Sequence, residues 1–158
     1  MNKLFLYDKD SVTTDTLRIM RTKKGYTCLP LTDDPEFFWS SISTLQKGDV
    51  FVLLSHGNKN GPLAVEGCYG DDIDLKMFSN VIKEKNLSLY LLSCHTGCDP
   101  CGKILTDNGV NFVAPLGLAV FQTVGSETIN ILSKEGDIYP GWAGPLCPGR
   151  GVTPLSLP

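Results

Sequence analysis

Two short apolar runs, each closed by a reactive side chain, constrain this 158-residue chain more than any other feature. The first run leads into Ser55, His56 and Gly57. The second leads into Ser93 and Cys94. Runs without polar alternation are typical of strands that are covered on both faces of a parallel sheet. Because the carboxyl ends of such strands meet at one crevice, the sequence predicts that His56 and Cys94 face each other across it.

Helix signals alternate with the apolar runs along the chain. Asp34 followed by Pro35 is a strong helix start, and Asp74 precedes apolar residues at helical spacing. The predicted strands are 4–7, 26–31, 49–55, 87–92 and 110–114. The predicted helices are one that ends at Arg21, one from 35 to about 46, one after Asp74, one over 102–108 and one from 121 to about 132, with a small hairpin in the loop 58–73. This alternation indicates an α/β fold with a mainly parallel sheet and right-handed crossovers.

The length fits one domain with a sizeable core. We assign residues 1–134 to this domain and residues 135–158 to an irregular tail, because the tail is rich in proline and glycine. Such a tail either wraps the surface or is mobile. It contains a Gly-Arg-Gly sequence at 149–151, which we consider as an autoprocessing point.

Composition limits the partners. The formal net charge is −3, and no block of like charge is present, so a nucleic-acid partner is not expected. No apolar stretch reaches the length that crosses a bilayer, and the start of the chain lacks a signal-peptide core, so we expect no membrane association and a cytoplasmic protein. In that reducing compartment the six cysteines are expected as free thiols, with Cys28 in the core.

The two strand ends predict cysteine chemistry. A thiol needs a nearby base to act as a nucleophile at neutral pH, and His56 is placed to serve Cys94 as that base. The backbone amides of Gly57 and Cys94 are candidate donors to a developing oxyanion. Three acidic residues near strand ends are candidates for substrate binding, although most loop aspartates are only solvated or capping: Asp8, Asp10 and Asp99.

A hydrophobic strand, His-Gly, a spacer, a second hydrophobic strand and Ser-Cys-x-x-Gly together resemble the caspase-like cysteine peptidases of clan CD, closest to the metacaspase and CHAT types. The resemblance runs from about Asp49 to Pro115. It implies a caspase-like three-layer sandwich with a mainly parallel central sheet flanked by helices. It also implies a thiol protease in which His56 is the general base, Cys94 is the nucleophile, and Gly57 and Cys94 form the oxyanion hole. The family usually has an aspartate where this chain has Leu92, so basic specificity by that route is not expected.

The function predicted at this point is a cysteine endopeptidase that hydrolyses peptide bonds through a Cys–His dyad and a thioester intermediate. It needs no cofactor and no metal. Its partner is a protein or peptide substrate, and an activating partner or signal is left open.

Three alternatives stay open. A catalytically inactive caspase-like fold would act as a small-molecule or protein binding module. The segment 94–101 carries one histidine and three cysteines, which suits a zinc site or, by its Cys-x3-Cys-x2-Cys spacing, a radical enzyme that uses S-adenosylmethionine. Cys98 and Cys101 also form a C-x-x-C pair, which suits a redox role.

Overall fold

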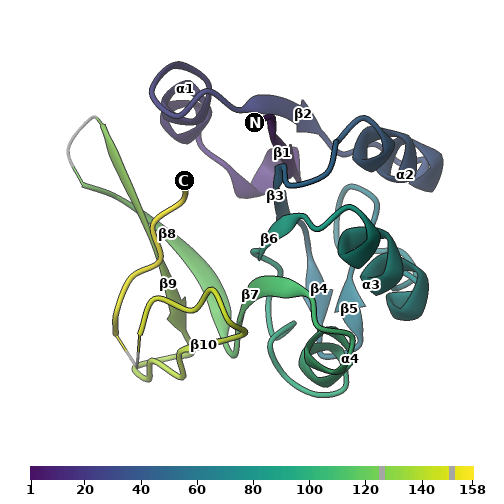
Figure 1. Ribbon diagram of the computed structural model, residues 1–158. Coiled ribbons are helices and arrows are strands. Elements are labelled where there is room, and N and C mark those ends of the chain that lie inside the picture. The colour runs from purple at the N-terminus through teal and green to yellow at the C-terminus, as the bar shows by residue number, and fades with distance from the viewer. Residues whose placement is uncertain (125–126, 150–151) are drawn as a thin grey trace.

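A six-stranded sheet forms the centre of the computed structural model, which describes residues 1–124, 127–149 and 152–158 (Figure 1). The strand order is β10-β7-β6-β3-β1-β2. Five strands run parallel, and β10 joins the edge antiparallel to β7. The bounds of the strands are β1 Lys3–Tyr7, β2 Thr27–Pro30, β3 Val50–Leu54, β6 Ser88–Leu91, β7 Asn111–Pro115 and β10 Trp142–Ala143. The strand β3 therefore lies in the middle of the sheet, between β1 and β6.

Both faces of the sheet are covered (Figure 1). The helices α2 (Pro35–Ser43), α3 (Leu75–Glu84) and α4 (Cys101–Asp107) pack on one face. The helix α1 (Thr14–Thr22) and a separate hairpin of β8 (Leu118–Val124) and β9 (Thr128–Lys134) pack on the other. A short 3-10 helix, η1 (Lys9–Ser11), follows β1, and a two-stranded ladder of β4 (Gly57–Asn58) and β5 (Gly61–Pro62) follows β3. The chain thus forms three layers around a central sheet.

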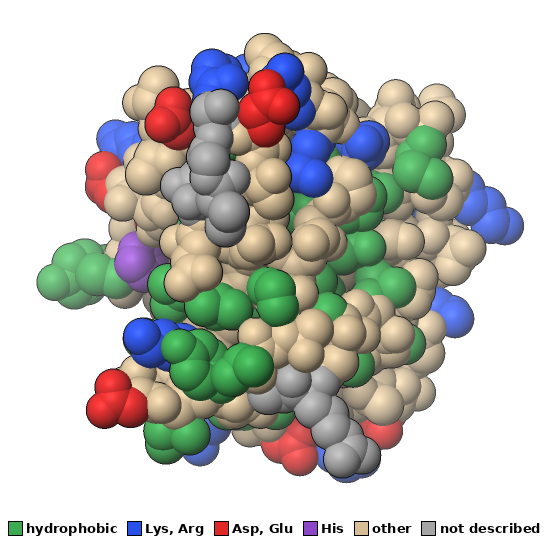
Figure 2. Space-filling view, turned by 90° about the vertical axis from the view of Figure 1, so that its left-hand side faces the viewer, with side chains coloured by type: hydrophobic (Ala, Val, Ile, Leu, Met, Phe, Trp, Pro, Cys, Tyr) green, Lys and Arg blue, Asp and Glu red, His purple; other side chains and the backbone are tan. Residues whose placement is uncertain are grey.

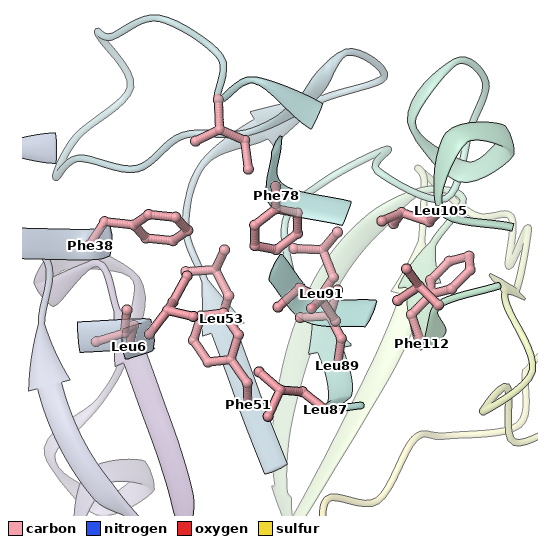
Figure 3. Packing of buried hydrophobic residues seen from close by; sticks show 14 of the residues in the cluster. Leu6, Phe38, Phe51, Leu53, Phe78, Leu87, Leu89, Leu91, Leu105 and Phe112 are labelled. Carbon is pink, nitrogen blue, oxygen red and sulfur yellow. The ribbon is translucent and has the colours of Figure 1, made fainter. Parts of the chain in front are cut away.

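The two-sided cover explains why β3 is apolar throughout. Phe51 and Leu53 point toward Phe38 of α2 and Phe78 of α3, as Figure 3 shows. The alternate residues of β3 point to the opposite face and join the cluster around Ile131 of β9. A strand with only one buried face would show polar residues at every second position instead.

The helix starts lie where the sequence predicts them. The Asp34 carboxylate accepts the backbone N–H of Glu36, and that of Asp74 accepts the N–H of Met77, so each aspartate caps one helix. The helix α2 ends at Ser43, earlier than expected. The backbone N–H of Gln46 donates to the Asp49 carboxylate, so this residue belongs to the turn that precedes β3.

The predicted helix from 121 to about 132 is wrong, because this segment forms the β8–β9 hairpin. Ile129 and Ile131 are buried, while Thr128 is exposed and Asn130 is half-buried, which is the two-residue period of a strand. β-Branched residues also favour this extended pairing over a helix.

The segment after Lys134 packs against the rest of the fold. Trp142 pairs with Pro115 in the sheet, and Leu155 exchanges two backbone hydrogen bonds with Ile131 of β9. The side chains of Leu155 and Leu157 are buried. In the Gly-Arg-Gly sequence, Arg150 and Gly151 lie outside the described residues. The division of the chain at residue 134 stays a prediction.

Figure 2 shows the side of the molecule on which the hairpin and the C-terminal segment lie. Apolar side chains gather across the middle of this face, and charged side chains lie around its rim. Among the large apolar residues that are exposed are Leu118 of β8 and Ile138 of the segment that follows β9. Within the described ranges, no helix is both long enough and apolar enough to span a bilayer.

The structure confirms an α/β fold with a mainly parallel central sheet flanked by helices. The narrower caspase-like assignment is not confirmed by this architecture.

Candidate functional site

The register of the central strands brings His56 and Cys94 to the same edge of the sheet. Leu53 of β3 is paired with Leu91 of β6, and two residues further on, Ser55 and Ser93 share a hydrogen bond of 2.9 Å between their hydroxyls. Both serines are buried. Since His56 and Cys94 directly follow these serines, the hydroxyl pair joins the two turns that carry the candidate base and the candidate nucleophile.

A cavity of about 380 Å³ contains both candidate residues in its wall. Its lining comes from η1 and the N-cap of α1, from the end of β3, from the turns after β3 and β6, and from the strand β8: Ser11, Thr13, Leu54, Ser55, His56, Leu92, Cys94, Ala119, Val120 and Phe121. Cavities of about 410 and 420 Å³ lie elsewhere on the chain, between α3 and α4 and beside α2. Volume therefore does not distinguish this cavity, whereas its histidine and thiol do.

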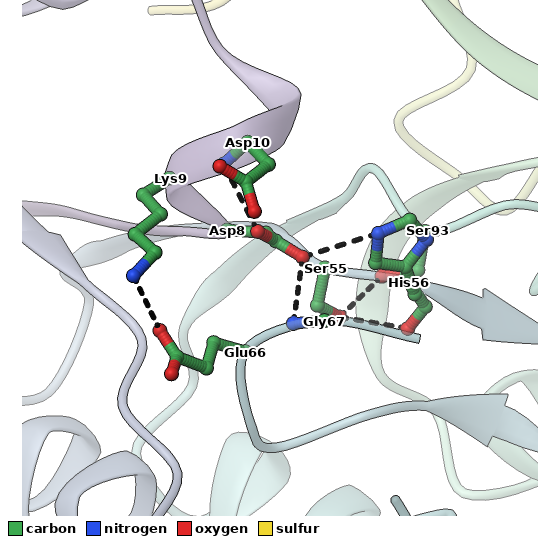
Figure 4. A network of polar contacts seen from close by, with 8 residues as sticks. All are labelled: Asp8, Lys9, Asp10, Ser55, His56, Glu66, Gly67 and Ser93. Carbon is green, nitrogen blue, oxygen red and sulfur yellow. Dashed lines mark hydrogen bonds and ion pairs between the residues drawn. The ribbon is translucent and has the colours of Figure 1, made fainter. Parts of the chain in front are cut away.

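A buried carboxylate holds the His56 ring (Figure 4). The Asp8 side chain is 0% exposed, and its Oδ2 lies 3.2 Å from His56 Nε2. The same oxygen accepts the backbone N–H of Gly67, and Oδ1 accepts that of Asp10. When Nε2 donates to Asp8, the lone pair of the neutral ring is on Nδ1.

Asp8 reaches His56 because β1 and β3 are neighbours. Tyr7 is paired with Leu54, and the Asp8 backbone N–H donates to the Leu54 carbonyl. The residue after β1 therefore lies beside the residues that follow β3. From the sequence, Asp8 is predicted only as an acid for substrate binding. Its contact with His56 depends on the pairing of β1 with β3, which no local sequence signal records.

Close backbone packing explains the glycines of the two motifs. A Cβ on Gly57 would lie 2.9 Å from the Cβ of Ser93, and one on Gly97 would lie 2.7 Å from the Ala114 carbonyl oxygen. His95, directly after Cys94, has a φ of 61°, a left-handed conformation that is uncommon for a side chain of this size. Its backbone N–H donates to the Gly117 carbonyl, so the sharp turn that carries Cys94 is fixed to the segment between β7 and β8.

The other two acidic candidates lie away from the cavity. Asp10 and Asp99 are exposed, and neither is among the residues that line it. Asp99 instead lies near Lys103 of α4, whose ammonium pKa is raised chiefly by a hydrogen bond from Lys103 to Asp107, with a smaller contribution from Asp99. Their role in substrate binding stays a prediction.

The histidine and the three cysteines of segment 94–101 do not point to a common centre. His95 pairs with Glu135, the Cys98 thiol donates to the Leu116 carbonyl, and Cys101 is buried. Across the described residues, no group of three or more His, Cys, Asp or Glu side chains is arranged to hold a metal ion. This arrangement gives no support to the alternative of a Cys/His metal-binding protein, because α4 turns Cys101 into the core.

All six cysteines are free thiols in this structure, and their surroundings differ. Burial raises the pKa of the Cys101 thiol to about 12, so this cysteine stays protonated. Cys68 and Cys147 are exposed, and Cys94 is half-buried at the cavity. Cys28 is also half-buried, and its pKa is raised by burial.

The chain is similar in part to solved aminotransferases. An aromatic-amino-acid aminotransferase from Burkholderia pseudomallei, covalently bound to pyridoxal phosphate, matches with 13% identity and a TM-score of 0.45. A cytoplasmic aspartate aminotransferase from Giardia lamblia matches with 14% identity and a TM-score of 0.45. An aromatic amino acid aminotransferase from Burkholderia cenocepacia J2315 matches with 15% identity and a TM-score of 0.43.

Each of these matches covers 72% of this chain and 30% of the solved chain, so the chain spans about 30% of the length of these enzymes. At such identities and TM-scores, the similarity assigns neither an activity nor a cofactor to this chain. No protein-family model matches the sequence, and no curated protein matches it as a relative.

These comparisons contradict the prediction of a caspase-like cysteine endopeptidase. The three similar structures are aminotransferases, and none of them is a caspase-like peptidase. The peptide-hydrolase function, its CHAT or metacaspase assignment and the inactive caspase-like binding module are therefore not retained. The physical reason is that the motifs describe only two strand ends, and parallel sheets with unrelated activities bring side chains together at that same edge.

Proposed function

We propose that this protein is an enzyme that uses Cys94 as a covalent nucleophile toward a small electrophilic substrate, with His56 as its base and Asp8 as a positioning residue. The proposal rests on one cavity whose lining contains both Cys94 and His56. The buried Asp8 carboxylate contacts Nε2 of the His56 ring. A nucleophile, a base and a third group that orients the base form the recurring arrangement of covalent catalysis.

The geometry supports a defined proton path. His56 Nδ1 takes the thiol proton of Cys94 as the sulfur attacks an electrophilic carbon, and it later returns that proton to the leaving group. The ring is a cation between these two steps. The Asp8 carboxylate, 3.2 Å from Nε2, stabilises that cation and fixes the tautomer of the neutral ring.

The backbone amides of Gly57 and Cys94 are proposed as donors to the negative charge that develops on the substrate. The tight packing of Gly57 against Ser93 supports this role, since it keeps the two turns close together. Donors that are fixed before the reaction stabilise a transition state without reorganisation.

Transamination is not proposed for this cavity. Pyridoxal phosphate enzymes hold their cofactor as a Schiff base on a lysine, and the residues described as lining this cavity include no lysine. For the arrangement of the elements alone, a three-layer sandwich of the caspase-like kind is proposed, because helices cover one face of the sheet and α1 with the hairpin covers the other. This proposal about the fold includes no peptidase activity.

A reducing, cytoplasmic location is also proposed, supported by six cysteines that are all free. The net charge of −3 supports the proposal that nucleic acid is not a partner.

The test measures thiol reactivity at each cysteine. The protein is treated with dilute chloroacetamide at pH 7, and the modified cysteines are followed by peptide mass spectrometry. Cys94 is expected to react about tenfold or more faster than the exposed Cys68 and Cys147, because an unassisted thiol is only a few per cent thiolate at this pH.

Matched variants show whether Cys94 reacts fast because His56 assists it or only because its thiol is accessible. His56→Gln and Asp8→Asn are expected to slow the labelling of Cys94 toward the rate of Cys68. His95→Gln and Asp10→Asn, which change a neighbouring histidine and a neighbouring aspartate, are expected to leave it unchanged. A Cys94 that reacts no faster than Cys68, or whose rate does not depend on His56, would refute the proposal.

A further inference from the structure

We infer that the cavity beside Cys94 selects a short, uncharged acyl group, which is transferred from a thioester to the Cys94 sulfur. This inference rests on the proposed nucleophilic role of Cys94 and adds the class of substrate. It is carried by the lining of the cavity, which combines one nucleophile with an apolar wall.

Apolar residues from three segments line the cavity that contains the thiol. Leu54 ends β3, Leu92 directly follows β6, and Ala119, Val120 and Phe121 belong to β8. A cavity of about 380 Å³ lies at the small end of the range that is usual for ligand sites. An alkyl chain would leave water and contact this wall, which favours binding by about fourfold for each buried methylene.

The lining offers no partner for a charged chain end. Apart from His56 and Cys94, the described lining residues carry no titratable side chain, and its remaining polar side chains are the hydroxyls of Ser11, Thr13 and Ser55. The Asp8 carboxylate, which contacts His56, is already occupied by that ring and two backbone N–H groups. A carboxylate or ammonium on the acyl chain would lose hydration without gaining an ion partner, so the cavity disfavours it.

The strand β8 determines how long the acyl group can be. It pairs with β9 in a separate two-stranded sheet, so a side-chain change in β8 leaves the backbone hydrogen bonds of the central sheet in place. Ala119 and Phe121 lie on the same face of β8 and pack toward the core, and Ala119 is the smallest side chain in the wall. A larger residue at 119 would therefore shorten the cavity.

The chemical step is an exchange of thioesters. The Cys94 sulfur forms a bond to the acyl carbon, the bond from that carbon to the sulfur of the donor breaks, and the donor leaves as a free thiol. The proton that Cys94 loses passes through His56 to this leaving thiolate. No oxidant, reductant or metal ion is needed, and the product is S-acyl Cys94.

The experiment uses four thioesters of N-acetylcysteamine, carrying acetyl, butyryl, hexanoyl and succinyl groups. The full chain is incubated with each donor at pH 7, and the mass added to the peptide that contains Cys94 is followed over time. Butyryl is expected to acylate Cys94 up to about fifteenfold faster than acetyl, because two more methylenes are buried. Succinyl, which has a carboxylate at a similar chain length, is expected to react at least about tenfold more slowly than butyryl.

Two variants test the wall. Ala119→Leu is expected to reverse the order of acetyl and butyryl, whereas Gln122→Leu, at an exposed position of β8 outside the lining, is expected to preserve it. Equal rates for butyryl and succinyl, or an unchanged order in Ala119→Leu, would overturn the inference. If chloroacetamide labels Cys94 in a His56-dependent manner and no thioester does, the inference fails and the proposed function stands. If neither reagent labels Cys94 preferentially, both fail.

Discussion

At the scale of single residues, the surroundings of a side chain decide its chemistry. Asp8 follows a strand in the same way as any loop aspartate, yet it is fully buried with three hydrogen-bonding partners. The cysteines differ in the same manner. Cys94 lies at a cavity beside a histidine, while Cys101, seven residues later, is buried among apolar side chains and has a pKa raised to about 12 by desolvation.

The raised pKa of Cys101 predicts a loss of stability in alkaline solution. Its reference pKa is 9.0, so the unfolded chain ionises this thiol at a pH at which the folded chain does not. The stabilising contribution is complete below about pH 9 and is lost as the pH rises toward 12. Between pH 8 and 10.5, the free energy of unfolding of the unsubstituted protein should fall by about 2 kcal/mol more than that of Cys101→Ala.

Urea denaturation at both pH values measures this difference, because every other titrating group is shared by the two proteins and cancels. Cys147→Ala, at an exposed position, is the control and should follow the unsubstituted protein. Parallel pH profiles for Cys101→Ala and the unsubstituted protein would contradict the prediction.

The hydrogen bond between Ser55 and Ser93 predicts that the two side chains are coupled in their contributions to the free energy of unfolding. Both hydroxyls are buried, so Ser55→Ala removes the Ser93 hydroxyl's hydrogen bond and costs about 1–3 kcal/mol of unfolding free energy. Ser93→Ala costs less, because the Ser55 hydroxyl keeps its hydrogen bond to the His56 carbonyl. The double variant Ser55→Ala/Ser93→Ala should lose about 1 kcal/mol less than the sum of the two single variants. Ser40→Ala, at an exposed position of α2, is expected to change the free energy by less than about 0.5 kcal/mol. Additive losses in this double-mutant cycle would show that the pair is not coupled.

At the scale of elements, both local sequence signals and tertiary contacts determine whether a segment becomes a helix or a strand. Aspartate caps and a proline start α2 and α3 where the sequence predicts them, because these signals act within one turn of the helix. The segment 121–132 is different. The sequence predicts a helix there, but Ile129 and Ile131 both pack on the sheet, and the partner strand β8 stabilises the extended form.

The hairpin predicts a contrast between neighbouring residues of β9. Ile131 is fully buried against the sheet, so Ile131→Ala should lower the free energy of unfolding by about 2–5 kcal/mol. Asn130 is half-buried and belongs to the opposite side of the strand, so Asn130→Ala should lower it by less than about 1 kcal/mol. Chemical denaturation of the two variants checks this. Similar losses at both positions would contradict an alternation of the two faces.

At the scale of the whole molecule, strand order assembles the candidate site from segments that are far apart in the sequence. The order β6-β3-β1 places the turns after three strands side by side, and each turn supplies one residue of the Cys94, His56 and Asp8 set. The last residues of the chain pack against β9 of the hairpin. Leu155 pairs with Ile131, and the Leu157 carbonyl accepts a hydrogen bond from the Lys24 ammonium.

The C-terminal segment is therefore expected to stabilise the whole fold. Replacing both Leu155 and Leu157 by alanine should lower the free energy of unfolding by at least about 4 kcal/mol, since each leucine is almost fully buried. Ser156→Ala, between them and exposed, is the control and should have a small effect. Urea denaturation measures both, and a loss below about 1 kcal/mol in the double variant would show that the segment is only loosely attached.

The sequence by itself determined the α/β class, most of the strands, the helix starts and the position of His56 and Cys94 at strand ends. These features depend on residues that are close together in the chain, through side-chain periodicity, capping and turn geometry. Only the tertiary structure decided that Asp8 binds His56, that Ser55 meets Ser93, that Cys101 leaves its neighbours for the core and that the hairpin replaces a helix. Each of these depends on which distant strands become neighbours, because a short motif records the conformation of its own turn and not the surface that packs against it.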